Sequence, residues 1–237
     1  METYQLWLIA LGILIFLLLM VFSSRRRIFR TYNRYMKVDN KHNITGKQLA
    51  FFLKEKLNLT NLRFALTQKK LGDAYNYKYS TLIMSEQVCN TASLAALTIV
   101  AHEMGHACQH KQNSALFGTT IFLTRLTRLT SVFIIPLLVC GLIFHFLQYP
   151  NENIGYILIV ISICLFIVQF LSKLLNIPLE YNASRRGLKF LKDYDVLSIT
   201  EYARAKRLLG IAAQTYIASF FDEMFSFVKI KKRKRRK

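Results

Sequence analysis

Two histidines with a glutamate beside the first, His102, Glu103 and His106, give the clearest chemical signal in this 237-residue chain. They form an H-E-x-x-H pattern that follows an apolar run, 94–101, typical of a helix. Residues four apart lie on one helix face, so both imidazoles can reach a single Zn²⁺ at about 2.0–2.1 Å. Glu103 lies one step round the helix, where its carboxylate can take a proton from metal-bound water. The pattern therefore predicts one catalytic zinc ion per chain, with Glu103 as general base.

A catalytic zinc site usually has three protein ligands and one water, so a third side chain is needed. The longer pattern that supplies a third histidine on the same segment is absent, because Gln109 and Gln112 occupy its glycine and histidine positions. Glu180 follows the last long apolar run and is the acidic residue best placed to return to the motif. Ser184, one turn later, shares its helix face and can hydrogen-bond a ligand imidazole. The alternative for Glu180 is an ordinary glutamate in the first turn of a helix.

Three uncharged apolar runs, 5–22, 129–147 and 154–171, are each long enough to cross a bilayer. Basic residues flank them on one side only, and the connection 148–153 contains neither lysine nor arginine. No basic residue precedes the first run and no small-residue cleavage site follows it, so we expect an uncleaved anchor. By the positive-inside rule, the C-terminal side of this anchor is cytoplasmic, and the other two runs form a hairpin that returns to the cytoplasm. The alternative, core helices of a soluble protein, is disfavoured because three such runs rarely occur together in a soluble core.

The net charge of +20 is concentrated in two segments, 25–37 and 229–237. Both flank segments expected at a membrane, so we predict contact with anionic lipid at the cytoplasmic face of the cell membrane. Binding to nucleic acid is not expected, because the basic segments lack the interleaved aromatic residues that single-strand binders use. None of the four cysteines forms a C-x-x-C pair, and no disulfide framework is expected in a reducing compartment.

The local patterns predict a mainly α-helical membrane protein with a small β-ribbon. Thr45 and Gln48 fit a capping box that starts a short helix. Segments 61–68 and 77–85 have strand composition, with a turn signal at Gly72-Asp73 between them. An interfacial helix is expected over 113–128, and a helix break at Asn176-Ile177-Pro178. A last helix is expected over 198–228, either buried or lying on the surface, without crossing the membrane. The resulting division is an anchor (1–24), a cytoplasmic part with the motif (25–128), the hairpin (129–175), a second cytoplasmic part (176–228) and a basic tail (229–237).

Three segments, 101–109, 178–186 and 212–216, resemble the YugP-like neutral zinc metallopeptidases of bacterial membranes. The layout is also similar to that of the HtpX-like membrane gluzincins. This resemblance implies a gluzincin-like zinc peptidase that acts on protein or peptide substrates. HtpX-like proteases typically carry an aspartate at the position of Ser184, and a serine holds an imidazole less strongly than a carboxylate does.

The leading hypothesis is a membrane-anchored zinc endopeptidase with His102, His106 and Glu180 as metal ligands. The side chains of Tyr216, Arg185 and Arg186 are candidate donors to the oxyanion. Segment 80–85 is a candidate edge strand for an extended substrate. The alternative is a membrane adaptor or scaffold with a non-catalytic zinc site, although such a site has no need of Glu103. An intramembrane protease is disfavoured because run 94–101 is too short to span.

Overall fold

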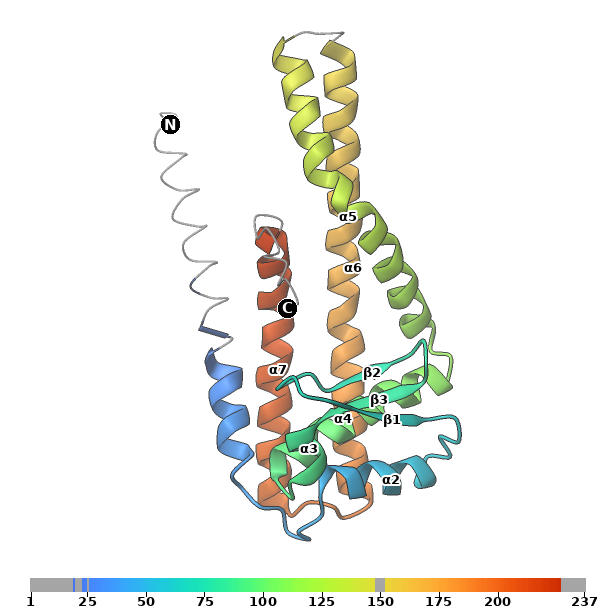
Figure 1. The fold of residues 1–237 in the computed structure, drawn as a ribbon, viewed down its shortest axis with the longest axis vertical. Helices are drawn as coiled ribbons and strands as arrows, with labels where there is room; N and C mark the ends of the chain where they lie inside the picture. The colour runs from blue at the N-terminus through green and yellow to red at the C-terminus, as the bar shows by residue number, and fades with distance from the viewer. Residues whose placement is uncertain (1–18, 20–22, 25, 148–151, 227–237) are drawn as a thin grey trace, which may run out of the picture.

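The computed structural model describes residues 19, 23–24, 26–147 and 152–226. The predicted basic tail 229–237 and nearly all of the predicted anchor 1–24 lie outside these residues. The described chain is mainly helical with one small sheet, as predicted (Figure 1). After a helix over 26–35, the elements are α2 (Gly46–Lys56), β1 (Arg63–Thr67), β2 (Ala74–Asn76), β3 (Thr81–Ser85), α3 (Glu86–Asn90), α4 (Leu94–Lys111), α5 (Ala115–Leu147), α6 (Glu152–Asp193) and α7 (Ile199–Ser226).

Helix α4, which carries the H-E-x-x-H pattern, lies at the centre of the packed core. Its N-terminal half is almost fully buried, with Leu94, Leu97 and Ala101 at 0% exposure. The Ser93 side chain caps the helix by accepting a hydrogen bond from the Ala96 amide. The neighbouring helix α2 begins with the predicted capping box, in which Thr45 and Gln48 bond each other's backbone amides. Burial and capping together fix the position of α4, so the motif residues start from a rigid element.

The sheet has three strands in the order β1-β3-β2, which differs from the predicted ribbon. Strands β1 and β3, the two predicted strands, pair in parallel, and β2 pairs antiparallel with β3. The Gly72-Asp73 turn therefore leads into β2 and does not join the two predicted strands directly. The prediction that 80–85 forms an edge strand is also wrong, because β3 is the middle strand.

Helices α5 and α6 are the two described helices that are long and apolar enough to cross a membrane. Only 11% of the most apolar stretch of each is buried, which is typical of helices that face lipid. The two helices are in close contact, since a Cβ added at Gly141 or Gly155 would overlap the backbone or side chains of the facing helix. Small residues at such positions allow membrane helices to approach each other. Helix α5 bends partway along its length (Figure 1), and Pro136 lies within it. The predicted interfacial helix 113–128 is the first part of α5 and not a separate element.

Helix α6 runs without interruption from Glu152 to Asp193, so the predicted break at Asn176-Ile177-Pro178 is wrong. Pro178 removes one backbone hydrogen bond, but this part of α6 packs against α4, with Ala183 at 0% exposure beside Gly105. Glu180 therefore lies inside a long helix, not in a first turn, and the helix-dipole alternative for it does not apply. The predicted last helix is present as α7, which packs against α6 and α4.

Candidate metal centre

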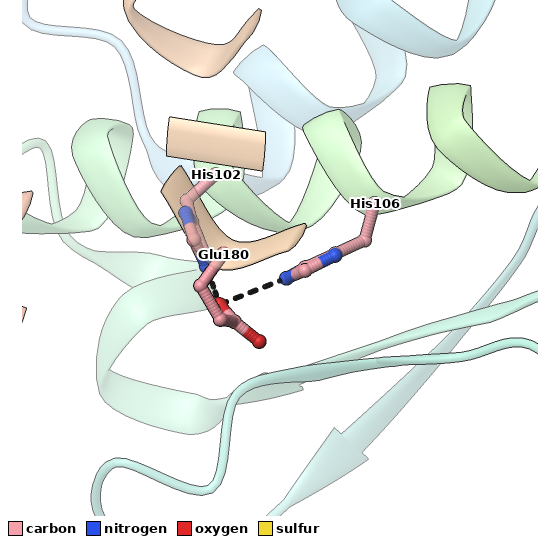
Figure 2. Close-up of side chains that lie close together, drawn as sticks. All are labelled: His102, His106 and Glu180. Carbon is pink, nitrogen blue, oxygen red and sulfur yellow. Dashed lines mark hydrogen bonds and ion pairs between the residues drawn. The ribbon is translucent and has the colours of Figure 1, made fainter. Parts of the chain in front are cut away.

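The side chains of His102, His106 and Glu180 converge where α4 and α6 meet (Figure 2). One carboxylate oxygen, Glu180 Oε2, lies 3.1 Å from His102 Nε2 and 3.2 Å from His106 Nε2. One potential ligand atom from each residue lies within 4.8 Å of the other two. The three side chains are 12–14% exposed. The structure thus brings the three predicted ligands to one point from two helices far apart in sequence.

This donor set fits zinc both in chemistry and in spacing. Two imidazole nitrogens and one carboxylate oxygen are a known ligand set of catalytic zinc sites. Two ligands at about 2.0–2.1 Å from one tetrahedral ion are about 3.3 Å apart. The observed separations of 3.1 and 3.2 Å between Glu180 Oε2 and the two nitrogens are close to this value. A Zn²⁺ ion would need little rearrangement of these side chains.

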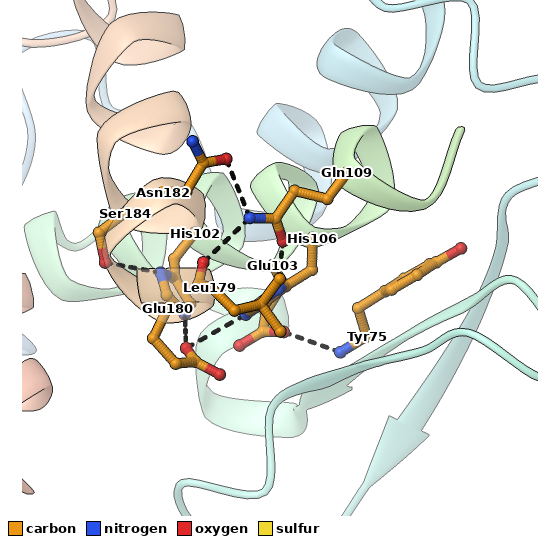
Figure 3. Close-up of polar contacts among 9 residues, drawn as sticks. All are labelled: Tyr75, His102, Glu103, His106, Gln109, Leu179, Glu180, Asn182 and Ser184. Atoms are coloured by element: carbon orange, nitrogen blue, oxygen red, sulfur yellow. Dashed lines mark hydrogen bonds and ion pairs between the residues drawn. The ribbon is translucent and has the colours of Figure 1, made fainter. Parts of the chain in front are cut away.

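The other nitrogen of each imidazole has a hydrogen-bond partner that fixes the ring (Figure 3). Ser184 Oγ lies 3.1 Å from His102 Nδ1. The sequence predicts a contact between Ser184 and a ligand imidazole, without specifying which of the two. Gln109 Oε1 lies 2.9 Å from His106 Nδ1. Because an amide oxygen only accepts, His106 Nδ1 donates to Gln109, and Nε2 is the nitrogen that faces Glu180 and would bind a metal after losing its proton.

Gln109 contacts His106 and α6, a role that the sequence did not predict. It is 1% exposed, and its amide nitrogen donates to Leu179 O at 2.9 Å and Asn182 Oδ1 at 3.0 Å. It therefore links His106 on α4 to the turn of α6 that carries Glu180. Its spacing of three residues from His106, on the same helix face, was the available signal.

Glu103 lies beside the three ligands, and strand β2 orients its carboxylate. The Tyr75 amide donates a hydrogen bond to Glu103 Oε2 at 2.7 Å (Figure 3). Burial raises the pKa of Glu103, while the two neighbouring imidazoles act in the opposite direction. A carboxylate with a raised pKa, held next to a metal site, is suited to accept and return a proton.

Without a metal ion, the side chains of His106 and Glu180 shift each other's pKa. Burial acts to lower the pKa of His106, but the hydrogen bond and the charge of Glu180 outweigh it and raise this pKa to about 9. Burial acts to raise the pKa of Glu180, but hydrogen bonds from His102 and His106 hold it well below its usual range. A metal at this point would replace the proton that these groups otherwise share.

Glycine lets α4 and α6 approach closely enough for this convergence. A Cβ on Gly105 would overlap the carbonyl of Ala183, and a Cβ on Gly187 would lie 2.7 Å from Ala101 O. Both obstacles are backbone atoms, which cannot move without separating the helices. The glycine inside the H-E-x-x-H pattern therefore sets the distance between the two histidines and Glu180.

We expect Gly105→Ala to weaken zinc binding at least about tenfold and to cost about 1–3 kcal/mol of stability, because the added methyl group forces α6 away. Isothermal titration with zinc and thermal unfolding in detergent would measure the two effects. Gly118→Ala is the matched control, since a Cβ there meets nothing within 4 Å. Equal zinc affinity in both variants would show that close helix contact is not needed.

The contact between Ser184 and His102 predicts that substitutions of Ser184 change the affinity for zinc, and that the new side chain decides the direction. Ser184→Ala should weaken zinc binding about tenfold, and Ser184→Asp should strengthen it by a similar factor, since a carboxylate orients an imidazole more firmly. Competition against a fluorescent zinc chelator would measure both. Unchanged affinity in both variants would contradict a role for Ser184 in holding His102.

The three candidate oxyanion donors have different positions. Arg186 bonds Asn182 Oδ1 and Gln112 Oε1, both at 2.7 Å, which places it in the network around Gln109. Arg185 is exposed and lines a separate pocket between α6 and α7. The side chain of Tyr216 lies outside the described residues. The hydrogen bonds of Arg186 and the position of Arg185 thus give no support to either as an oxyanion donor.

Comparison with known proteins agrees with the chemistry of this site. A family model described as "Putative neutral zinc metallopeptidase" matches residues 8–232. The chain is also 23% identical over 211 residues to "Putative membrane protease YugP" of Bacillus subtilis (strain 168), covering 88% of each chain. No solved structure matches. With the family model extending over nearly the whole chain, the protein belongs to this family of zinc metallopeptidases.

Proposed function

We propose that the chain is a membrane-anchored zinc endopeptidase whose site faces the cytoplasm. The observation that carries this proposal is the convergence of His102, His106 and Glu180 with Glu103 beside them. The cytoplasmic orientation is supported by the basic residues that flank the apolar runs. The family of metallopeptidases to which the chain belongs supports peptide-bond hydrolysis.

The residues of the site suggest how the reaction would proceed. The two histidines and Glu180 would hold the zinc ion, which would supply a water of lowered pKa and polarise the scissile carbonyl. Glu103 accepts the proton of the attacking water on its carboxylate and delivers it to the leaving amine nitrogen. The hydrogen bonds with Ser184 and Gln109 hold the imidazole rings of His102 and His106 in fixed orientations during these steps.

Strand β2 is the element that we expect to bind the substrate backbone. One side of β2 pairs with β3, and on the other side the Tyr75 amide bonds Glu103 at 2.7 Å. A substrate in extended conformation can lie along this outer edge of the sheet and place its peptide bond beside Glu103. The edge that contacts substrate would then be 74–76, in place of the segment 80–85 that the sequence suggested.

The full-length protein, purified in detergent, tests the proposal on an unfolded protein substrate. We expect cleavage in the presence of zinc, loss of cleavage with a chelator, and recovery when zinc is added back. Mass spectrometry of the products would show internal cuts for an endopeptidase. One bound zinc ion per chain without any cleavage would favour the non-catalytic adaptor instead.

A further inference from the structure

A pocket of about 260 Å³ opens directly beside the metal centre, with His102 and Glu103 in its wall. Its other walls come from the helix over 26–35, the loop before β2, and α7. The size is just below the range of about 300–1,000 Å³ that is typical of small-molecule sites, which suits a single amino-acid side chain. Most of the wall is apolar, from Ile28, Leu71, Ile99, Leu208, Leu209 and Ala212.

Two polar side chains, Asp73 and Tyr32, also line this pocket. The Asp73 carboxylate accepts hydrogen bonds from the Ser85 amide at 2.6 Å and from Ser85 Oγ at 3.1 Å. Burial raises the pKa of Asp73, and it also raises the pKa of Tyr32, which the charge of Asp73 raises further. The carboxylate and the phenol therefore act on each other within a poorly solvated region.

The hydroxyl of Tyr32 is buried and makes no hydrogen bond of normal geometry within the described part of the chain, although the Ser85 side chain lies close enough to act against the rise in its pKa. The residue as a whole is 1% exposed. Buried hydroxyls almost always have a hydrogen-bond partner, because a buried polar group without one destabilises the fold. Because protein atoms cover this hydroxyl, an occupant of the pocket can supply a closer partner only after a small movement of the pocket wall.

We propose that this pocket binds a lysine or arginine side chain of the substrate next to the scissile bond, with Asp73 and Tyr32 as specificity-determining residues. The long aliphatic stem of such a side chain fits the apolar wall, and its cationic end meets the Asp73 carboxylate and the Tyr32 oxygen. An acidic side chain would be repelled by Asp73 and Glu103. An apolar side chain would leave the Asp73 charge desolvated without a new partner. This inference rests on the proposed peptidase function, because the occupant is part of a substrate.

Peptides that differ at one position test the pocket. Four labelled ten-residue peptides would carry lysine, arginine, norleucine or glutamate at the same central position, with norleucine as the uncharged match for the lysine stem. With the zinc-loaded full chain in detergent, we expect kcat/KM for the lysine and arginine peptides to exceed that for norleucine at least tenfold. Product masses should place the basic residue directly beside the cut bond.

Two variants and one control assign that preference to the pocket. Asp73→Asn should reduce the preference for lysine over norleucine about tenfold, and Tyr32→Phe, which removes only the hydroxyl, should reduce it by about threefold. Asp193→Asn removes an exposed carboxylate at the far end of α6 and should leave the preference unchanged. A preference retained in both Asp73→Asn and Tyr32→Phe would overturn the proposal, as would equal cleavage of all four peptides.

Direct binding separates failure of the pocket from failure of the proposed function. Fluorescence anisotropy with zinc-free wild-type protein measures affinity where nothing is cut. At least tenfold tighter binding of the lysine peptide than of the norleucine peptide, weakened in the Asp73→Asn and Tyr32→Phe variants, would support the pocket even if no peptide is hydrolysed. Equal affinity for all four peptides would overturn it even if hydrolysis occurs.

Discussion

Replacing Glu103 with glutamine is expected to lower kcat by about 10²–10⁴-fold while one zinc ion still binds per chain. Glutamine keeps the size of the side chain and an oxygen that can accept the hydrogen bond from the Tyr75 amide. It cannot accept a proton from the attacking water. The three predicted metal ligands are untouched, so the loss should appear in kcat and not in zinc content.

Activity and metal content must be measured on the same samples. Zinc stoichiometry by inductively coupled plasma mass spectrometry, together with cleavage of an unfolded protein, gives both values for wild type and Glu103→Gln. Glu55→Gln, at an exposed position on α2, serves as the control for loss of one carboxylate and should retain full activity. Equal turnover by wild type and Glu103→Gln would exclude Glu103 as the general base.

Removing the carboxylate of Glu180 should abolish high-affinity zinc binding, and hydrolysis with it. Glu180→Ala deletes a carboxylate oxygen that lies within 3.2 Å of both imidazoles. Loss of a group that only orients a ligand costs about 10–100-fold in metal affinity, so loss of the ligand itself should exceed about 100-fold. The variant also removes the group that contributes most to raising the pKa of His106, so this pKa should be lower in the metal-free protein.

Asp193→Ala provides the control on the same helix, since Asp193 is exposed near the end of α6. Zinc affinity from chelator competition and circular dichroism of the metal-free protein would separate loss of the site from loss of the fold. Full zinc occupancy in Glu180→Ala at micromolar zinc would remove Glu180 from the metal centre.

The sequence predicted those features that depend on local pattern. The helices around Thr45 and His102 follow from capping residues and apolar periodicity, and the structure confirms both. Glu180 was placed with the histidines by elimination and by the direction of the membrane hairpin. The structure brings these three side chains together, while their role as zinc ligands stays a prediction.

The features that the sequence did not predict depend on contacts between distant segments. Strands β1 and β3 pair in parallel, with β2 on the other side of β3, and composition alone does not specify strand order or direction. Pro178 was expected to end a helix, but α6 continues through it. Gln109 and Gly105 act through their contacts with α6, which only the packing of α4 against that helix reveals.

The continuous course of α6 has a consequence for which bonds such an enzyme can reach. In the proposed membrane arrangement, the last apolar run ends just before Lys173, and Glu180 follows seven residues later on the same helix. At 1.5 Å per residue, the metal centre lies about 10 Å beyond the hydrocarbon edge, and a rigid helix holds it at that height. An extended substrate leaving the bilayer covers this distance in about three residues, and a helical one in about seven. The length of α6 between the membrane edge and Glu180 thus sets the smallest number of residues between a substrate's own membrane span and its cleavage site.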